Sequence, residues 1–111
     1  MSGTRGEGLR RIEREIASEK AAALGRAGER LERLLAEAAR AAARLLGARH
    51  EDDRTRCVQA YAALRRQTLE ARLALLIQRE ALGLRRHATV DQQFPEPPQV
   101  ADLLRRNTLE N

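Results

Sequence analysis

Residues 9–46 decide the fold, and they read LRRIEREIASEKAAALGRAGERLERLLAEAARAAARLL. Starting at Leu9, one set of positions recurs every three or four residues as far as Leu45. The distance from Leu9 to Leu45 is 36 positions and is covered in ten steps, which gives a period of 3.6 residues, the period of the α-helix. All these positions are apolar except Lys20. The steps follow an 11-residue repeat, so the pattern predicts a nearly straight helix over 9–46.

Two glycines lie inside this predicted helix, at Gly25 and Gly28, and the apolar pattern stays in phase across them. Each glycine costs about 1 kcal/mol in a helix interior. We favour one continuous helix, in which the glycines let the second helix approach closely. The alternative is a turn at 25–28, which would give a three-helix bundle.

The boundaries of the other segments follow from breaker residues. Three glycines in residues 1–8 predict a disordered N-terminus. Gly47 has the position of a helix C-terminal glycine, so we expect a turn over 47–52. A second helix is expected over 53–84, capped by Asp52 or Asp53. The chain is therefore predicted to be all-α, built on a long antiparallel two-helix hairpin.

The second predicted helix contains an apolar block, Leu73–Ile77, that is apolar on every side. Such a helix segment requires burial all round, which two helices cannot supply. A symmetric homodimer that forms a four-helix bundle would supply it. The residues expected in the core or the dimer interface are Leu24, Leu35, Leu69, Leu73, Leu76 and Ile77.

Residues 85–111 are predicted to form a C-terminal tail. The prolines in Phe94-Pro95-Glu96-Pro97-Pro98 require an extended path, and a short helix is expected near 99–106. The tail has two interpretations: Phe94 folds back onto the open end of the hairpin near Leu9, or the segment binds a protein partner as proline-rich ligands do. The residues concerned are Phe94, Pro95, Pro97 and Pro98.

The charge of the chain is +5, and Lys20 is the only lysine among 21 basic residues. An antiparallel hairpin would bring the start of the first helix beside the end of the second. This juxtaposition predicts an arginine-rich end that could bind phosphate groups of nucleic acid, although basic residues there also favour the helix dipole. The arginines at that end are Arg10, Arg11, Arg14, Arg79, Arg85 and Arg86.

No catalytic, cofactor-binding or metal-binding residues emerge from the sequence. His50–Asp53 has metal-ligand types but no second cluster to complete a coordination shell, so we interpret it as a polar turn. Cys57 lies on an apolar seam, typical of a buried small hydrophobe, and a lone cysteine excludes an internal disulfide. No apolar run approaches the ~20 residues of a membrane span, so we expect a soluble, cytoplasmic protein without membrane contacts.

These observations favour a non-enzymatic structural or protein-interaction module. We expect a homodimeric helical bundle that presents its C-terminal tail or its surface to an unknown protein partner. The alternative is a nucleic-acid-associated protein that uses the arginine-rich end. No motif in the chain identifies a family.

Overall fold

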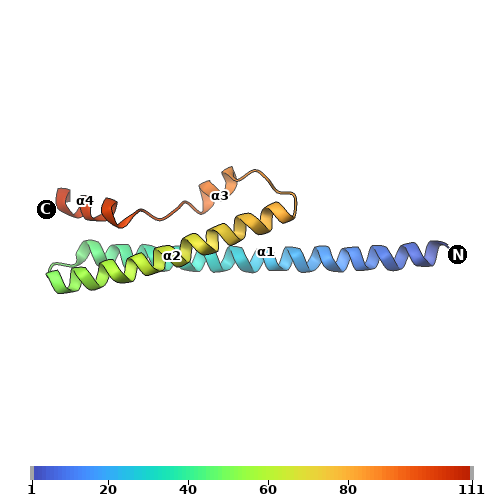
Figure 1. Ribbon diagram of the computed structural model, residues 1–111, viewed down its shortest axis with the longest axis horizontal. Helices are drawn as coiled ribbons and strands as arrows, with labels where there is room; N and C mark the ends of the chain where they lie inside the picture. The colour runs from blue at the N-terminus through green and yellow to red at the C-terminus, as the bar shows by residue number, and fades with distance from the viewer. Residues whose placement is uncertain (1, 111) are drawn as a thin grey trace.

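The computed structural model describes residues 2–110 and the side chains of residues 6–108. All regular secondary structure in this range is helical, in the order α1 (Ser2–Gly47), α2 (Glu51–Ala81), α3 (Ala88–Gln93) and α4 (Val100–Glu110). Figure 1 shows α1 and α2 packed as an antiparallel hairpin, with the rest of the chain returning along it. The predicted all-α hairpin fold is thus confirmed for the described residues.

Helix α1 is continuous across Gly25 and Gly28, so the alternative with a turn at 25–28 is excluded. A Cβ atom added to either glycine would meet nothing within 4 Å. The predicted close approach of α2 at these glycines is therefore wrong. Helix α1 also begins at Ser2, where the sequence predicted disorder over 1–8, and Met1 lies outside the described residues. Extending an existing helix costs much less than nucleating one, which accounts for the glycine-containing first turns.

Helix α2 begins at Glu51, with His50 as its N-cap residue in an extended conformation. The predicted cap, Asp52 or Asp53, instead lies in the first turn, where acidic side chains favour the helix dipole. The helix ends at Ala81, three residues before the predicted end. Gly83 has a φ of +83°, and the Leu84 amide donates to the Arg79 carbonyl oxygen at 2.9 Å. These features form a C-terminal glycine cap.

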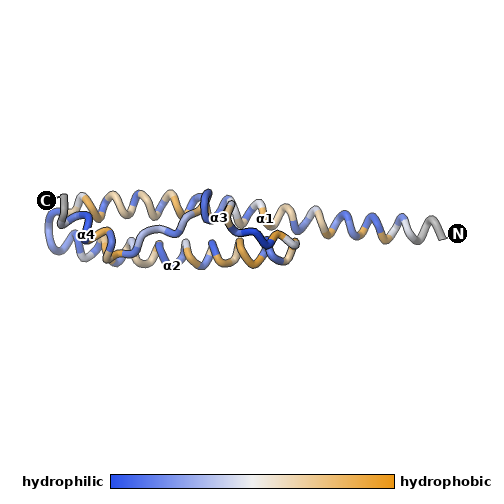
Figure 2. Tube along the Cα trace, turned by 90° about the horizontal axis from the view of Figure 1, so that it is seen from above, coloured by the Kyte–Doolittle hydropathy of each residue, from blue (hydrophilic) through white to orange (hydrophobic). Residues whose placement is uncertain are grey.

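After Gly83 the chain turns back and lies over the groove between α1 and α2 (Figures 1 and 2). The short helix α3 was not predicted, because six residues are too few to show a helical period. The extended proline-containing segment and a terminal helix were predicted, and α4 begins at Val100. From here on, "the tail" means residues 88–108, the part of the predicted tail over 85–111 whose side chains the structure describes from α3 onward.

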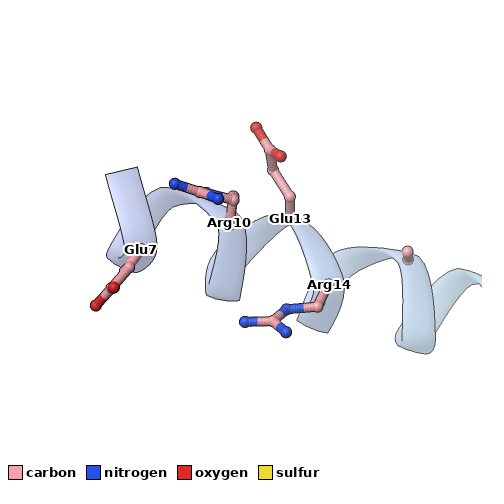
Figure 3. Close-up of a pocket in the computed structure, with 5 residues that line it drawn as sticks. Glu7, Arg10, Glu13 and Arg14 are labelled. Atoms are coloured by element: carbon pink, nitrogen blue, oxygen red, sulfur yellow. The ribbon is translucent and has the colours of Figure 1, made fainter. Parts of the chain in front are cut away.

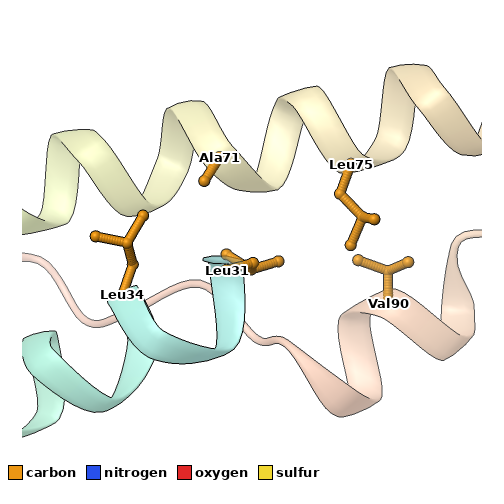
Figure 4. Close-up of a cluster of buried hydrophobic side chains, with 5 residues drawn as sticks. All are labelled: Leu31, Leu34, Ala71, Leu75 and Val90. Carbon is orange, nitrogen blue, oxygen red and sulfur yellow. The ribbon is translucent and has the colours of Figure 1, made fainter. Parts of the chain in front are cut away.

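The core consists of two clusters to which α1, α2 and the tail all contribute. The first contains Leu31 and Leu34 of α1, Ala71 and Leu75 of α2, and Val90 of α3 (Figure 4). The second lies nearer the turn and is formed by Ala38, Ala41, Leu45, Tyr61 and Leu103. The tail therefore supplies part of the surface that the hairpin needs to cover its apolar face.

Gly25 and Gly83 should respond oppositely to substitution by alanine. Gly25→Ala should stabilise the protein by about 1 kcal/mol, because the site is helical and open. Gly83→Ala should destabilise it by about 1–2 kcal/mol, because a side chain is strained at positive φ. Urea unfolding followed by circular dichroism measures both. Destabilisation by Gly25→Ala would contradict a continuous α1.

Candidate functional site

The most unusual surface of the molecule is the N-terminal part of α1, which extends beyond the end of α2 (Figure 1). The difference in length between the helices, 46 residues against 31, produces this projection. Every residue from 7 to 22 is exposed. We call residues 7–22 the arm. No other helix in the described part of the chain packs against it.

The arm carries a row of large apolar side chains. Leu9, Ile12 and Ile16 are 58%, 53% and 46% exposed. Their spacing of three and four residues puts them on one face of the helix, in phase with the buried row that contains Leu31 and Leu34. The core-facing side of α1 thus continues past the point where α2 ends, and it is left uncovered there.

The concave surface nearest to this row offers no enclosed site. It is a depression of about 410 Å³ lined by Glu7, Arg10, Glu13, Arg14 and Ala17, all on α1. In Figure 3, Glu7 and Arg14 point to one side of the helix and Glu13 to the other. Side chains on a single helix that diverge in this way cannot exclude water from a ligand. This depression therefore lacks the enclosure that a small-molecule site requires.

A second exposed apolar patch lies towards the end of α2. Leu73 and Ile77 are 58% and 57% exposed, and Leu84 just beyond the helix is also exposed. The other residues predicted for the core or interface are half-buried within the single chain. Of these, Leu24, Leu35 and Leu76 pack against the first core cluster. The hairpin and tail therefore enclose only part of the apolar block Leu73–Ile77.

Three side chains of α2 hold the tail through its carbonyl oxygens. The Tyr61 hydroxyl donates to the Pro98 oxygen at 2.5 Å, and Arg65 Nε donates to the Pro97 oxygen at 3.1 Å. Arg72 Nε donates to the Phe94 oxygen at 2.8 Å. Phe94 packs against the first core cluster, in the middle of the hairpin. The predicted position of Phe94 at the open end near Leu9 is therefore wrong.

Arg72 is the main polar anchor of the tail, and it was missed from the sequence. Only 8% of its surface is exposed. Its guanidinium also pairs with Asp91, and it lies 3.8 Å from a carboxylate oxygen of Glu96. Both carboxylates are largely exposed, so the bond to the Phe94 carbonyl is the better-shielded contact. The sequence signal that could have revealed this role is the position of an arginine directly before the apolar block Leu73–Ile77.

Tyr61 lies where the second core cluster meets the tail, and it is fully buried. Burial raises the pKa of its hydroxyl, which the positive charges of Arg65 and Arg106 partly oppose. The neutral hydroxyl is the form that can donate to the Pro98 oxygen. The site thus stabilises protonated Tyr61.

The arginines predicted at one end of the hairpin fall into two groups. Arg10, Arg11 and Arg14 lie on the arm, and Arg79, Arg85 and Arg86 lie at or just after the end of α2. Arg79 donates to the Arg86 carbonyl oxygen at 3.0 Å. No contact between the two groups is seen among the described side chains, because the arm projects beyond α2 (Figure 1).

The remaining candidate groups are dispersed. Among the described side chains of residues 6–108, no three His, Cys, Asp or Glu groups converge as metal ligands would. Cys57 is half-buried beside the second core cluster. Within the described residues, no helix combines the length and apolar character needed to cross a membrane. No protein-family model, curated protein or solved structure matches the chain significantly.

Replacing Arg72 should loosen the tail. Arg72→Met keeps the aliphatic stem but leaves the Phe94 carbonyl without its donor, which should cost about 1.5–3 kcal/mol. Arg66→Met, on an exposed position of the same helix, should cost less than about 0.5 kcal/mol. Hydrogen exchange should show faster exchange in 88–108 for Arg72→Met alone. Equal exchange in the two variants would contradict the anchoring role.

Tyr61 is the only tyrosine, so alkaline titration by ultraviolet absorbance reports it directly. The native midpoint should lie above the ordinary value of 10.0 and return towards it in denaturant. Because the folded pKa is raised, this contribution to stability is complete below pH 10 and is lost as pH rises through the folded pKa. A native midpoint at or below the denatured one would contradict the burial of the hydroxyl.

Proposed function

We propose that the chain is a non-enzymatic protein-interaction module that forms a homodimer through the arm. The observation that carries this proposal is the exposed row Leu9, Ile12 and Ile16, in phase with the buried row of the same helix. A row of this kind on an exposed helix is typical of a surface that packs against another helix. The arm of a second copy takes the place that a longer α2 would have occupied.

Symmetry favours a second copy as the partner. Two arms can pair antiparallel about a two-fold axis, so that the same row is used on both sides. Burying the exposed half of each side chain contributes about 1 kcal/mol, and six such side chains meet in the dimer. Association costs several kcal/mol, which offsets most of this gain, so we expect a weak dimer whose population rises with protein concentration.

Two modes of association differ in whether the second exposed patch, Leu73 and Ile77, is also covered in the dimer. A four-helix bundle would cover Leu73 and Ile77 as well as the arm, whereas pairing of the arms alone would leave them exposed.

The tail is a less favoured surface for binding a protein partner. Pro97 is buried and the Phe94 and Pro98 carbonyls are occupied, so the tail would have to leave the hairpin to bind a partner.

Analytical ultracentrifugation of the full chain at about 50 μM tests the proposal. We expect a dimer, and we expect Ile12→Glu to shift it to monomer because a charge would be buried in the interface. Ala21→Glu is the matched control and should remain dimeric, because a residue nine positions later lies on the opposite face of the helix.

Leu73→Glu separates the two modes of association. Loss of the dimer would support the four-helix bundle, and its retention would support pairing of the arms alone. A wild-type chain that sediments as a fully helical monomer at this concentration would refute the proposed function.

A further inference from the structure

A second surface, separate from the arm, carries a row of arginines along α1. Its members follow one another at steps of 4, 3, 7 and 4 residues, so they share one face of the helix. They are Arg26, Arg30, Arg33, Arg40 and Arg44. All five are exposed. The row is ~27 Å long at 1.5 Å per residue. Glu37 is the one acidic residue within it, and Glu29 borders it.

This arginine row lies on the side of the hairpin that the tail does not cover. Arg26 and Arg30 line a shallow groove of about 310 Å³ together with Ala74 and Gln78 of α2. Arg72, which holds the tail, is two residues before Ala74 and therefore points to nearly the opposite side of α2. The tail lies over the other groove between the helices (Figure 2). We call the side with the arginine row the open face.

The α2 side of the open face opposes the row mostly with small and neutral side chains; the exposed Glu70, between Gln67 and Ala74, is the acidic residue at its edge. Ala60, Gln67 and Ala74 recur every seven residues and are exposed, and Gln78 follows one turn later. Among the described side chains, none of the five arginines forms an ion pair; the pairs present involve Arg56, Arg72, His87 and Arg105. No direct ion pair therefore occupies these five guanidinium groups, and Glu37 and Glu29 leave the row with a net positive charge.

We propose that the arginine row binds the phosphate backbone of a nucleic-acid duplex without reading its sequence. Arginine guanidinium groups match phosphate oxygens in planar, bidentate contacts. A straight, rigid row suits a regular array of phosphates. Alanine and glutamine side chains beside it leave the arginines accessible to a broad, convex ligand.

Two alternatives fit the open face less well. Single strands are held largely by stacking on aromatic side chains, and the two aromatics of the chain, Tyr61 and Phe94, are buried and half-buried at the tail. An acidic protein partner would need a central apolar or aromatic anchor, which the alanine-lined groove does not provide. The large exposed apolar side chains lie on the arm and at the end of α2 instead.

Fluorescence anisotropy of the full chain with two labelled 30-base-pair DNA duplexes of unrelated sequence tests this proposal. Binding should be of similar strength for both duplexes and should weaken steeply between 50 and 200 mM salt. The variant Arg26→Gln/Arg30→Gln/Arg33→Gln should bind roughly tenfold or more weakly at 50 mM salt. Its slope of log affinity against log salt should be smaller by about 3, one unit for each lost phosphate contact.

The matched control removes the same charge from exposed positions outside both the open face and the arm: Arg49→Gln/Arg66→Gln/Arg105→Gln. It should bind nearly as wild type, and circular dichroism should show equal helicity for all three proteins. Equal losses in the two variants would assign binding to net charge alone and overturn the proposal. Absence of duplex binding at 50 mM salt, or binding of a labelled poly-glutamate peptide in its place, would overturn it as well.

Discussion

Gly83 ends α2 in a left-handed conformation, and the arrangement of the remaining chain depends on that stop. Helix α2 is left shorter than α1, so one face of α1 has no partner beyond it. The chain turns back at the same point and covers one groove of the hairpin. The arm, the covered groove and the open face are three consequences of one helix ending early.

The covered groove is closed by contacts to main-chain atoms. Tyr61, Arg65 and Arg72 each donate to a tail carbonyl, and two of these three carbonyls belong to prolines. A proline segment lacks most of its own amide donors, so its carbonyls depend on donors from elsewhere. Val90 and Leu103 then complete the two core clusters. The tail thus acts as a third layer that the two long helices lack.

The local elements of this fold were predictable, because their signals are local. The 3.6-residue period predicted α1 from Leu9 onward but not its first turns, and Gly47 and Gly83 marked the C-terminal ends of both long helices within three residues. The path of the tail was not predictable, because carbonyl acceptors occur at every residue and leave no signature in the sequence. The role of Arg72 was not predictable for the same reason, because it depends on the tail bringing the Phe94 carbonyl back to α2. The exposure of the row on the arm was not predictable, because its apolar spacing is the same as that of the buried row and does not show which part of α1 lacks a partner.

We propose that a second copy covers the arm, and hydrogen exchange at increasing protein concentration tests this most directly. An unpartnered helix of this length has little stability of its own. We expect amide protection in residues 7–22 to rise with concentration, while protection in residues 26–45 stays constant. Exchange in the arm that is equally fast at every concentration up to about 100 μM would contradict the central claim.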